Sequence, residues 1–198
     1  MPGLLGLVGA AFLLGAIPFA WLLVRVVRKT DVRRHGSGNP GATNASRLFS
    51  PRLRLPVFLL VFLLDAGKGY LAVGLLPKLF STGSDLAPVL CAAAAVAGHI
   101  FMPFLGFRGG QGVATTVGVL FALDPVATLF SLGAFFIAAA LARDVAAGSL
   151  AFAAALPAAG VVRGEEPLSV GVLAVALGVL IVVRHRTNIR EMLQRAPP

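Results

Sequence analysis

Leu53–Phe80 reads LRLPVFLLVFLLDAGKGYLAVGLLPKLF. A helix needs about 20 predominantly apolar residues to cross a bilayer, and this stretch exceeds that length. Ser50 and Pro51 precede it, a helix-capping residue followed by the proline that favours a first helical position. The stretch therefore predicts a transmembrane helix that begins close to Pro51.

Outward from this stretch, most of the chain is equally apolar. Of the 198 residues, 58% are hydrophobic and 13% are charged, whereas soluble domains carry about 25% charged residues. Asp124 and Pro125 repeat the pattern of a helix start. We expect one polytopic membrane domain over residues 1–198, an all-α bundle of seven transmembrane helices. The approximate spans are 4–27, 53–80, 86–104, 113–123, 125–141, 145–162 and 168–183, of which 113–123 is short for a full crossing.

The net charge of +9 would suggest nucleic acid in a soluble protein, but here it fits cytoplasmic loops beside anionic lipid. No Lys or Arg precedes Arg25, and cations then crowd the region up to Arg54 and the tail from Arg184. This distribution predicts that the N-terminus lies outside and the C-terminus in the cytoplasm. Cys91 is the only cysteine, so an intrachain disulfide is excluded.

Three polar islands interrupt the apolar segments. The first runs from Ser37 to Asn44 and continues to Arg47. Glycines allow close approach of the backbone to an anion, and the neighbouring side chains supply donors. The G-x-G-x-x-G spacing lacks the strand that a dinucleotide fold requires, so we reject that interpretation. An ordinary turn-rich loop is the alternative. The candidate anion-binding residues are Ser37, Gly38, Asn39, Gly41, Thr43, Asn44 and Arg47.

The second island, Gly106–Gly112, is rich enough in glycine to surround a phosphate closely, although it lacks the Gly-Lys-Ser/Thr end of a P-loop. A flexible connector between helices is the alternative. His99, shortly before the island, is expected to pack or to hydrogen-bond between helices. The candidate binding residues are Arg108, Gly109, Gly110, Gln111 and Gly112.

The third island carries His185 and Asn188, three residues apart and hence on one face of a helix. Its arginines also fit a simple cytoplasmic anchor. Asp65 and Lys68 share a helical face inside the second apolar segment. Either a structural ion pair or contact with substrate would account for them.

These blocks together resemble a known family, the bacterial acyl-phosphate-dependent glycerol-3-phosphate acyltransferases (the PlsY family). The first island is similar to its G-S-G-N-x-G-A-T-N block, and Leu64–Gly69 to its L-D-x-x-K-G block. Gly98–Thr115 resembles its glycine-rich block, and Arg184–Ile189 its C-terminal block. The order and spacing agree across nearly the whole chain.

The resemblance implies transfer of a fatty acyl group from acyl phosphate to the sn-1 hydroxyl of glycerol 3-phosphate, giving lysophosphatidic acid and phosphate. It implies a multi-pass protein of the bacterial plasma (inner) membrane, with the active site facing the cytoplasm. It assigns catalysis to Ser37, His185 and Asn188, with Arg47 and the glycine-rich block binding phosphate. We expect no metal, cofactor, nucleic acid or protein partner; the partners are the two substrates and the lipid bilayer.

Two departures from the family pattern are visible. Arg108 and Gln111 stand where the family usually has lysine, and the G-x-E that tends to follow its C-terminal block is missing. These departures motivate one alternative, a catalytically silent paralogue. A transporter of a phosphorylated anion is a second alternative that stays open. No His-x-x-x-x-Asp dyad follows His35, His99 or His185, which argues against acyltransferases that use that general base.

Overall fold

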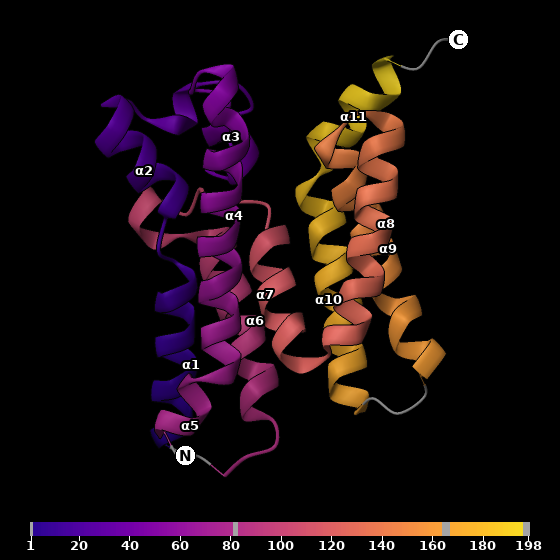
Figure 1. Cartoon of the computed structure of the whole chain (residues 1–198). Helices are drawn as coiled ribbons and strands as arrows, with labels where there is room; N and C mark the ends of the chain where they lie inside the picture. The colour runs from indigo at the N-terminus through magenta and orange to yellow at the C-terminus, as the bar shows by residue number, and fades with distance from the viewer. Residues whose placement is uncertain (1, 81–82, 164–166, 196–198) are drawn as a thin grey trace. The chain divides into compact units, whose positions relative to one another are not determined.

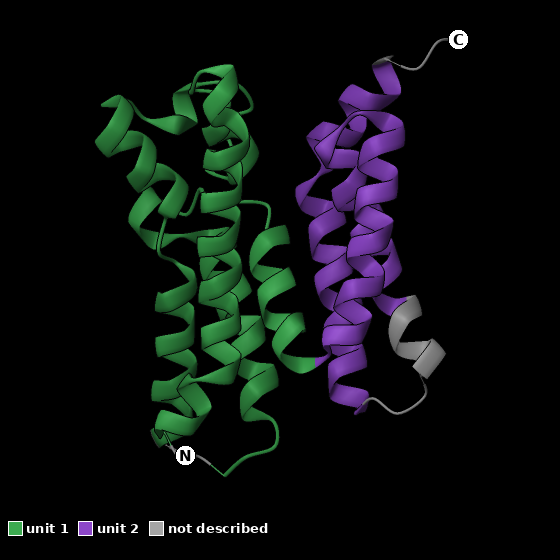
Figure 2. Cartoon of the chain, viewed as in Figure 1, with its two compact units in different colours: residues 1–123 green, residues 124–198 purple. Residues whose placement is uncertain are grey.

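A computed structural model of the chain describes residues 2–80, 83–163 and 167–195, all of them in helices or the connections between helices. The chain divides into two compact units, residues 1–123 and residues 124–198 (Figure 2). Each unit is a set of antiparallel helices with its own packing. The prediction of one domain across the chain stays a prediction.

Unit 1 contains the first two islands and most of the helices. Its helices are α1 (Pro2–Gly15), α2 (Phe19–Arg28), η1 (Val32–Arg34), α3 (Ala42–Ser46), α4 (Pro51–Gly74), α5 (Leu76–Phe80), α6 (Ala87–Phe101), η2 (Pro103–Leu105) and α7 (Val113–Leu123). α1, α4, α6 and α7 run side by side (Figure 1). The expected span 4–27 is interrupted at Ala16–Pro18, because Pro18 has no N–H with which to continue the helical hydrogen bonds.

Glycines set the close packing of two helix pairs in unit 1. A Cβ at Gly98 of α6 would overlap the backbone carbonyl oxygen of Phe12 of α1. A Cβ at Gly118 of α7 would overlap the carbonyl oxygen of Ala66 of α4. Small residues allow helices to approach closely in membranes, where lipid removes most of the hydrophobic driving force between helices. These two contacts hold α1 on α6 and α4 on α7.

Unit 2 comprises α8 (Pro125–Ala142), α9 (Val145–Arg163), α10 (Leu168–Arg184) and α11 (Arg186–Arg195). The predicted start at Asp124 is confirmed, since its Oδ1 accepts the backbone N–H groups of Val126 (3.1 Å) and Ala127 (3.0 Å). Ser50, by contrast, makes no side-chain cap bond, although α4 does begin at Pro51. α10 and α11 meet at a bend of 55°.

The helices have the composition of an integral membrane protein. Among the residues that the structure describes, four helices are long and apolar enough to cross a bilayer: Gly3–Arg28, Pro51–Phe80, Ala87–Leu105 and Pro125–Ala142. The bent pair α10–α11 would be a fifth, and Val113–Leu123 and Val145–Pro157 are shorter apolar helices. Leu59, Leu60 and Leu63 on α4 are exposed, as lipid-facing side chains are expected to be. The apolar segments of the sequence are largely helical, with the first one interrupted at Ala16–Pro18, while seven crossings remain a prediction.

Candidate anion-binding site

The first island is a loop organised around one buried side chain, Asn44. Its amide nitrogen donates to the carbonyl oxygens of Val32 (3.0 Å), His35 (2.9 Å) and Asn39 (3.1 Å). Its Oδ1 accepts the backbone N–H of Ser37 at 3.3 Å. Asn44 is only 3% exposed. Because its polar atoms are used inside the loop, Asn44 shapes the island instead of presenting donors outward.

Glycines let the first island close around Asn44. Gly36 and Gly38 have φ values of 54° and 70°, in the left-handed region that favours glycine. A Cβ at Gly36 would overlap the Asn44 oxygen. The loop then enters the short helix α3, which begins at Ala42 directly after Gly41 and contains Thr43. Ser37 and Arg47 are exposed. The Ser37 Oγ also accepts the backbone N–H of Asn39 at 3.5 Å.

The second island folds back on the end of α6. The backbone N–H of Gly109 donates to the carbonyl oxygen of Ile100 (3.1 Å), and that of Gly110 donates to the carbonyl oxygen of His99 (3.0 Å). A Cβ at Gly109 would overlap those carbonyl oxygens, and one at Gly110 would overlap the His99 ring. The glycines therefore seat the loop on the helix, and these two amides bond to protein carbonyls. Arg108 is exposed.

One side-chain contact joins the two islands, and a second joins the segments just before them. Asn39 Nδ2 donates to Gln111 Oε1 at 2.9 Å, and Arg33 Nη1 donates to the carbonyl oxygen of Leu105 at 2.9 Å. Arg33 also pairs with Asp31 at 2.7 Å. This pairing holds the pKa of the Asp31 carboxyl well below its usual value, so Asp31 is ionised and anchors Arg33. The structure thus brings together islands that are 72 residues apart in sequence.

The third island lies in unit 2. His185 is 1% exposed, at the junction of α10 and α11, and its Nδ1 lies 2.8 Å from the carbonyl oxygen of Ile181. A carbonyl oxygen only accepts, so Nδ1 carries the proton, and a neutral ring has its lone pair on Nε2. Asn188 is half-buried in the first turn of α11. Convergence of these two residues with the first two islands stays a prediction.

Two buried charged residues of α4, Asp65 and Lys68, form an ion pair. Lys68 Nζ lies 2.7 Å from Asp65 Oδ1, and both side chains are almost completely buried. Lys68 also donates to the carbonyl oxygen of Ile17 at 2.8 Å. Of the two explanations that the sequence left open, this geometry favours the structural pair.

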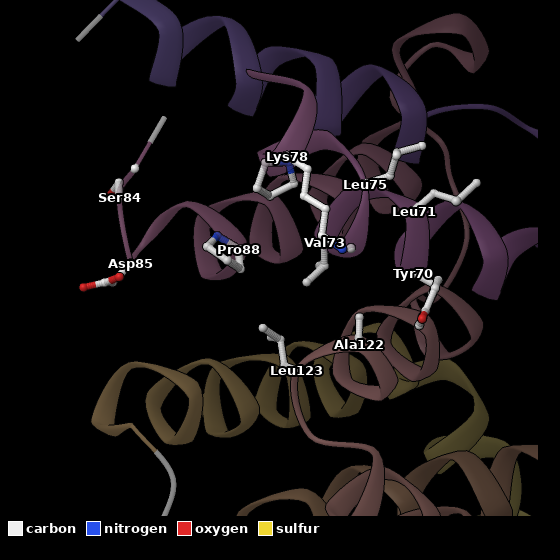
Figure 3. Close-up of a pocket in the computed structure, with 13 residues that line it drawn as sticks. Tyr70, Leu71, Val73, Leu75, Lys78, Ser84, Asp85, Pro88, Ala122 and Leu123 are labelled. Carbon is white, nitrogen blue, oxygen red and sulfur yellow. The ribbon is translucent and has the colours of Figure 1, made fainter. Parts of the chain in front are cut away.

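A hollow of about 820 Å³ lies at the far end of unit 1, between the ends of α4 and α7 that are remote from the islands. Figure 3 shows the residues that line it, with Asp85 at one edge and Tyr70 at the other. None of the predicted site residues lines this hollow. The candidate site is therefore the joined islands and not the hollow.

Sequence reasoning missed Arg33 and the internal role of Asn44. Arg33 is one of several cations in its region, and nothing in its spacing sets it apart. Asn44 was recognised as a donor, but the carbonyls that it contacts meet only when the loop is folded. His99 was expected to pack or hydrogen-bond, and Gly110 does rest on its ring and carbonyl.

Comparisons with known proteins agree with one another over nearly the whole chain. The family model described as glycerol-3-phosphate acyltransferase matches residues 5–195. The glycerol-3-phosphate acyltransferase of Syntrophomonas wolfei is 40% identical over 181 residues, covering 91% of this chain and 89% of that protein. That of Anaeromyxobacter sp. (strain K) is also 40% identical, covering 98% and 96%.

Solved structures give the same result. The crystal structure of PlsY (YgiH), an integral membrane glycerol 3-phosphate acyltransferase in its glycerol 3-phosphate form, matches with a TM-score of 0.82 and 37% identity, covering 96% of this chain and 92% of that one. Its lysophosphatidic acid form matches with a TM-score of 0.80 and 36% identity, over the same shares of the two chains.

Proposed function

The chain belongs to the glycerol-3-phosphate acyltransferase family, and from this premise we propose that it transfers a fatty acyl group from an acyl phosphate to glycerol 3-phosphate. The sn-1 hydroxyl oxygen attacks the acyl carbonyl carbon, and a new ester bond forms. The bond between that carbon and the phosphate's bridging oxygen breaks. The products are lysophosphatidic acid and inorganic phosphate, and the hydroxyl proton leaves with a base.

One observation carries the proposal: the bond between Asn39 and Gln111 joins two glycine-containing, donor-bearing islands at one end of unit 1. Both proposed substrates carry phosphate, so a site that handles them must accommodate two anions. Two adjacent islands with exposed Ser37, Arg47 and Arg108 suit that demand.

We assign a role to each candidate residue according to whether its side chain is exposed or helps to shape a loop. We assign Ser37, Arg47 and Arg108 to phosphate, because they are exposed beside the loops. The remaining candidates shape the loops that carry them, and this group comprises Gly38, Asn39, Gly41, Thr43, Asn44, Gly109, Gly110, Gln111 and Gly112. Acyl phosphate is already activated, so positioning and charge stabilisation can supply most of the catalysis.

Two groups can take the proton of the attacking hydroxyl: Nε2 of His185 or an oxygen of a substrate phosphate. The bond from Nδ1 of His185 to Ile181 leaves Nε2 as the basic nitrogen of the neutral ring. Asn188 would orient the glycerol part. In His185→Gln, turnover near the wild-type rate would exclude His185 as an essential base, and loss of turnover with unchanged glycerol 3-phosphate binding would support it.

We further propose seven crossings of the bacterial plasma (inner) membrane, with the N-terminus outside and all three islands at the cytoplasmic face. The support is the concentration of Lys and Arg after the first apolar segment and after the last one. A transporter of phosphorylated anions would need a polar path through the bilayer. The buried pairing of Asp65 with Lys68 offers no such path.

The test is an assay of the purified protein in lipid, with palmitoyl phosphate and labelled glycerol 3-phosphate. We expect labelled lysophosphatidic acid from the wild type and its loss in Ser37→Ala. Glycerol 3-phosphate binding without turnover, restored to turnover by Gln111→Lys, would instead indicate the silent paralogue. Flux of glycerol 3-phosphate into proteoliposomes without a donor would indicate the transporter.

A further inference from the structure

Three ionisable side chains are buried together in unit 1 and take no part in the chemistry proposed above. Asp65 and Lys68 of α4 are each 2% exposed, and His99 of α6 is 3% exposed. Asp65 Oδ1 lies 2.7 Å from Lys68 Nζ and 3.6 Å from His99 Nδ1. The carboxylate thus stands between a cation on its own helix and an imidazole on the neighbouring one.

Such a network is a poor way to stabilise a helical bundle. A lone charge in a transmembrane helix is costly to insert, and pairing removes only part of that cost. Well-packed apolar side chains often stabilise as much as a buried ion pair or more. Buried charges are better explained when they select one arrangement of the surrounding segments.

The network touches the two segments that precede the islands. Lys68 Nζ donates to the carbonyl oxygen of Ile17 at 2.8 Å and lies 5.6 Å from the ring centre of Phe19, both at the break between α1 and α2. α2 and η1 lie between this break and the first island. Lys68 therefore ties α4 to the start of the helix through which the chain approaches the first island.

At its other end the network supports the second island. The ring of His99 occupies the space that a side chain at position 110 would need, and the His99 carbonyl oxygen accepts the Gly110 N–H at 3.0 Å. A tilt of the imidazole would displace Gly110 and with it the exposed Arg108. The Asp65 carboxylate faces the imidazole, and so it limits that tilt.

We propose that Asp65, Lys68 and His99 are positioning residues, which hold the α1–α2 break and the glycine-rich loop in one arrangement so that the donors of both islands meet the same phosphate. They act through the loop and do not touch the substrate. The inference rests on the proposed function in one respect, namely that the arrangement serves glycerol 3-phosphate binding.

The first readout separates positioning from stability. Asp65→Asn and His99→Gln are compared with Cys91→Ala, a matched substitution at a fully buried position of α6 away from the network. In lipid, we expect the two network variants to raise the KM for glycerol 3-phosphate about 10- to 100-fold, the size of effect expected when a hydrogen bond to a charged phosphate is weakened. Their kcat at saturation should change much less. Cys91→Ala should lower thermal stability and leave KM unchanged.

The second readout does not depend on turnover. Amide hydrogen exchange of residues 106–112 in the intact protein should accelerate in Asp65→Asn and His99→Gln, and not in Cys91→Ala. Unchanged exchange in the folded network variants would overturn the proposal, whether or not KM rises. If Asp65→Asn does not fold, His99→Gln decides, because it leaves the ion pair intact. If the wild type makes no lysophosphatidic acid, the proposed function fails while loop exchange still tests the positioning.

Discussion

The clearest test of the candidate site is removal of the Asn44 side-chain amide, with Asn44→Leu as the perturbation. Leucine has the same number and branching of side-chain heavy atoms but cannot bond the carbonyl oxygens of Val32, His35 and Asn39. The amide carries two hydrogens for these three acceptors, and its Oδ1 also accepts the Ser37 N–H, so three to four bonds' worth of stabilisation disappears. At about 1 kcal/mol for each bond, the folded loop loses about 3–4 kcal/mol, which corresponds to a kcat/KM roughly 150- to 900-fold lower.

The assay is turnover of palmitoyl phosphate and glycerol 3-phosphate in lipid, with thermal unfolding of the same preparations. Ser46→Ala is the matched control, since it removes one buried hydroxyl bond in the same helix, from Ser46 Oγ to the Thr43 carbonyl oxygen, and spares the loop. We expect a change of at most severalfold in the control. A folded Asn44→Leu protein with wild-type kcat/KM would refute the view that Asn44 shapes the site.

Three further predictions follow from single contacts. In a double-mutant cycle of Asn39→Ala and Gln111→Ala, kcat/KM should show a coupling of about 0.5–1.5 kcal/mol, and additive effects would mean that the bond between the islands has no functional weight. Gly118→Ala should lower the melting temperature, because the added Cβ would overlap the carbonyl oxygen of Ala66. Gly67→Ala is the control and should not lower it, because the space around Gly67 is open. Equal shifts in the two variants would contradict the packing argument. Asp124→Ala should lower the free energy of unfolding by about 0.5–2 kcal/mol through loss of its cap, with an unchanged KM, and calorimetry with kinetics checks both values.

Much of the helical architecture could be predicted from the sequence, because apolar runs and capping residues act locally. Pro51 and Pro125 begin helices where the pattern places them. The interruption at Ala16–Pro18 could have been suspected from Pro18, but an apolar run conceals it. A hydropathy scale reports only how readily side chains transfer into lipid, so it does not register a break in the helical backbone. The break is tolerated in the structure because Lys68 donates a hydrogen bond to the freed carbonyl oxygen of Ile17.

The site was less predictable than the helices. The residue types in the islands show that hydrogen-bond donors are present. They do not show which of these donors form hydrogen bonds within the protein. Gly109 and Gly110 looked suited to phosphate, yet their amides bond to the end of α6. The contact of Asn39 with Gln111 spans 72 residues, and no periodic pattern reports such a contact. These features depend on tertiary geometry, which single-sequence reasoning cannot supply.

The contact between Asn39 and Gln111 also restricts where the chain can change length during evolution. The intervening segment runs away from the islands along α4 and returns along α6. The contact therefore requires that Asn39 and Gln111 lie at the same height along the bundle and that their side chains point toward each other. One residue inserted into either helix would rotate everything beyond it by about 100° and advance it by about 1.5 Å. The turn at residues 83–85, at the far ends of these helices, does not set this alignment. Inserted residues there add little to the entropy cost of closing the loop. Natural length variation between the two islands should therefore concentrate at that turn, away from the chemistry.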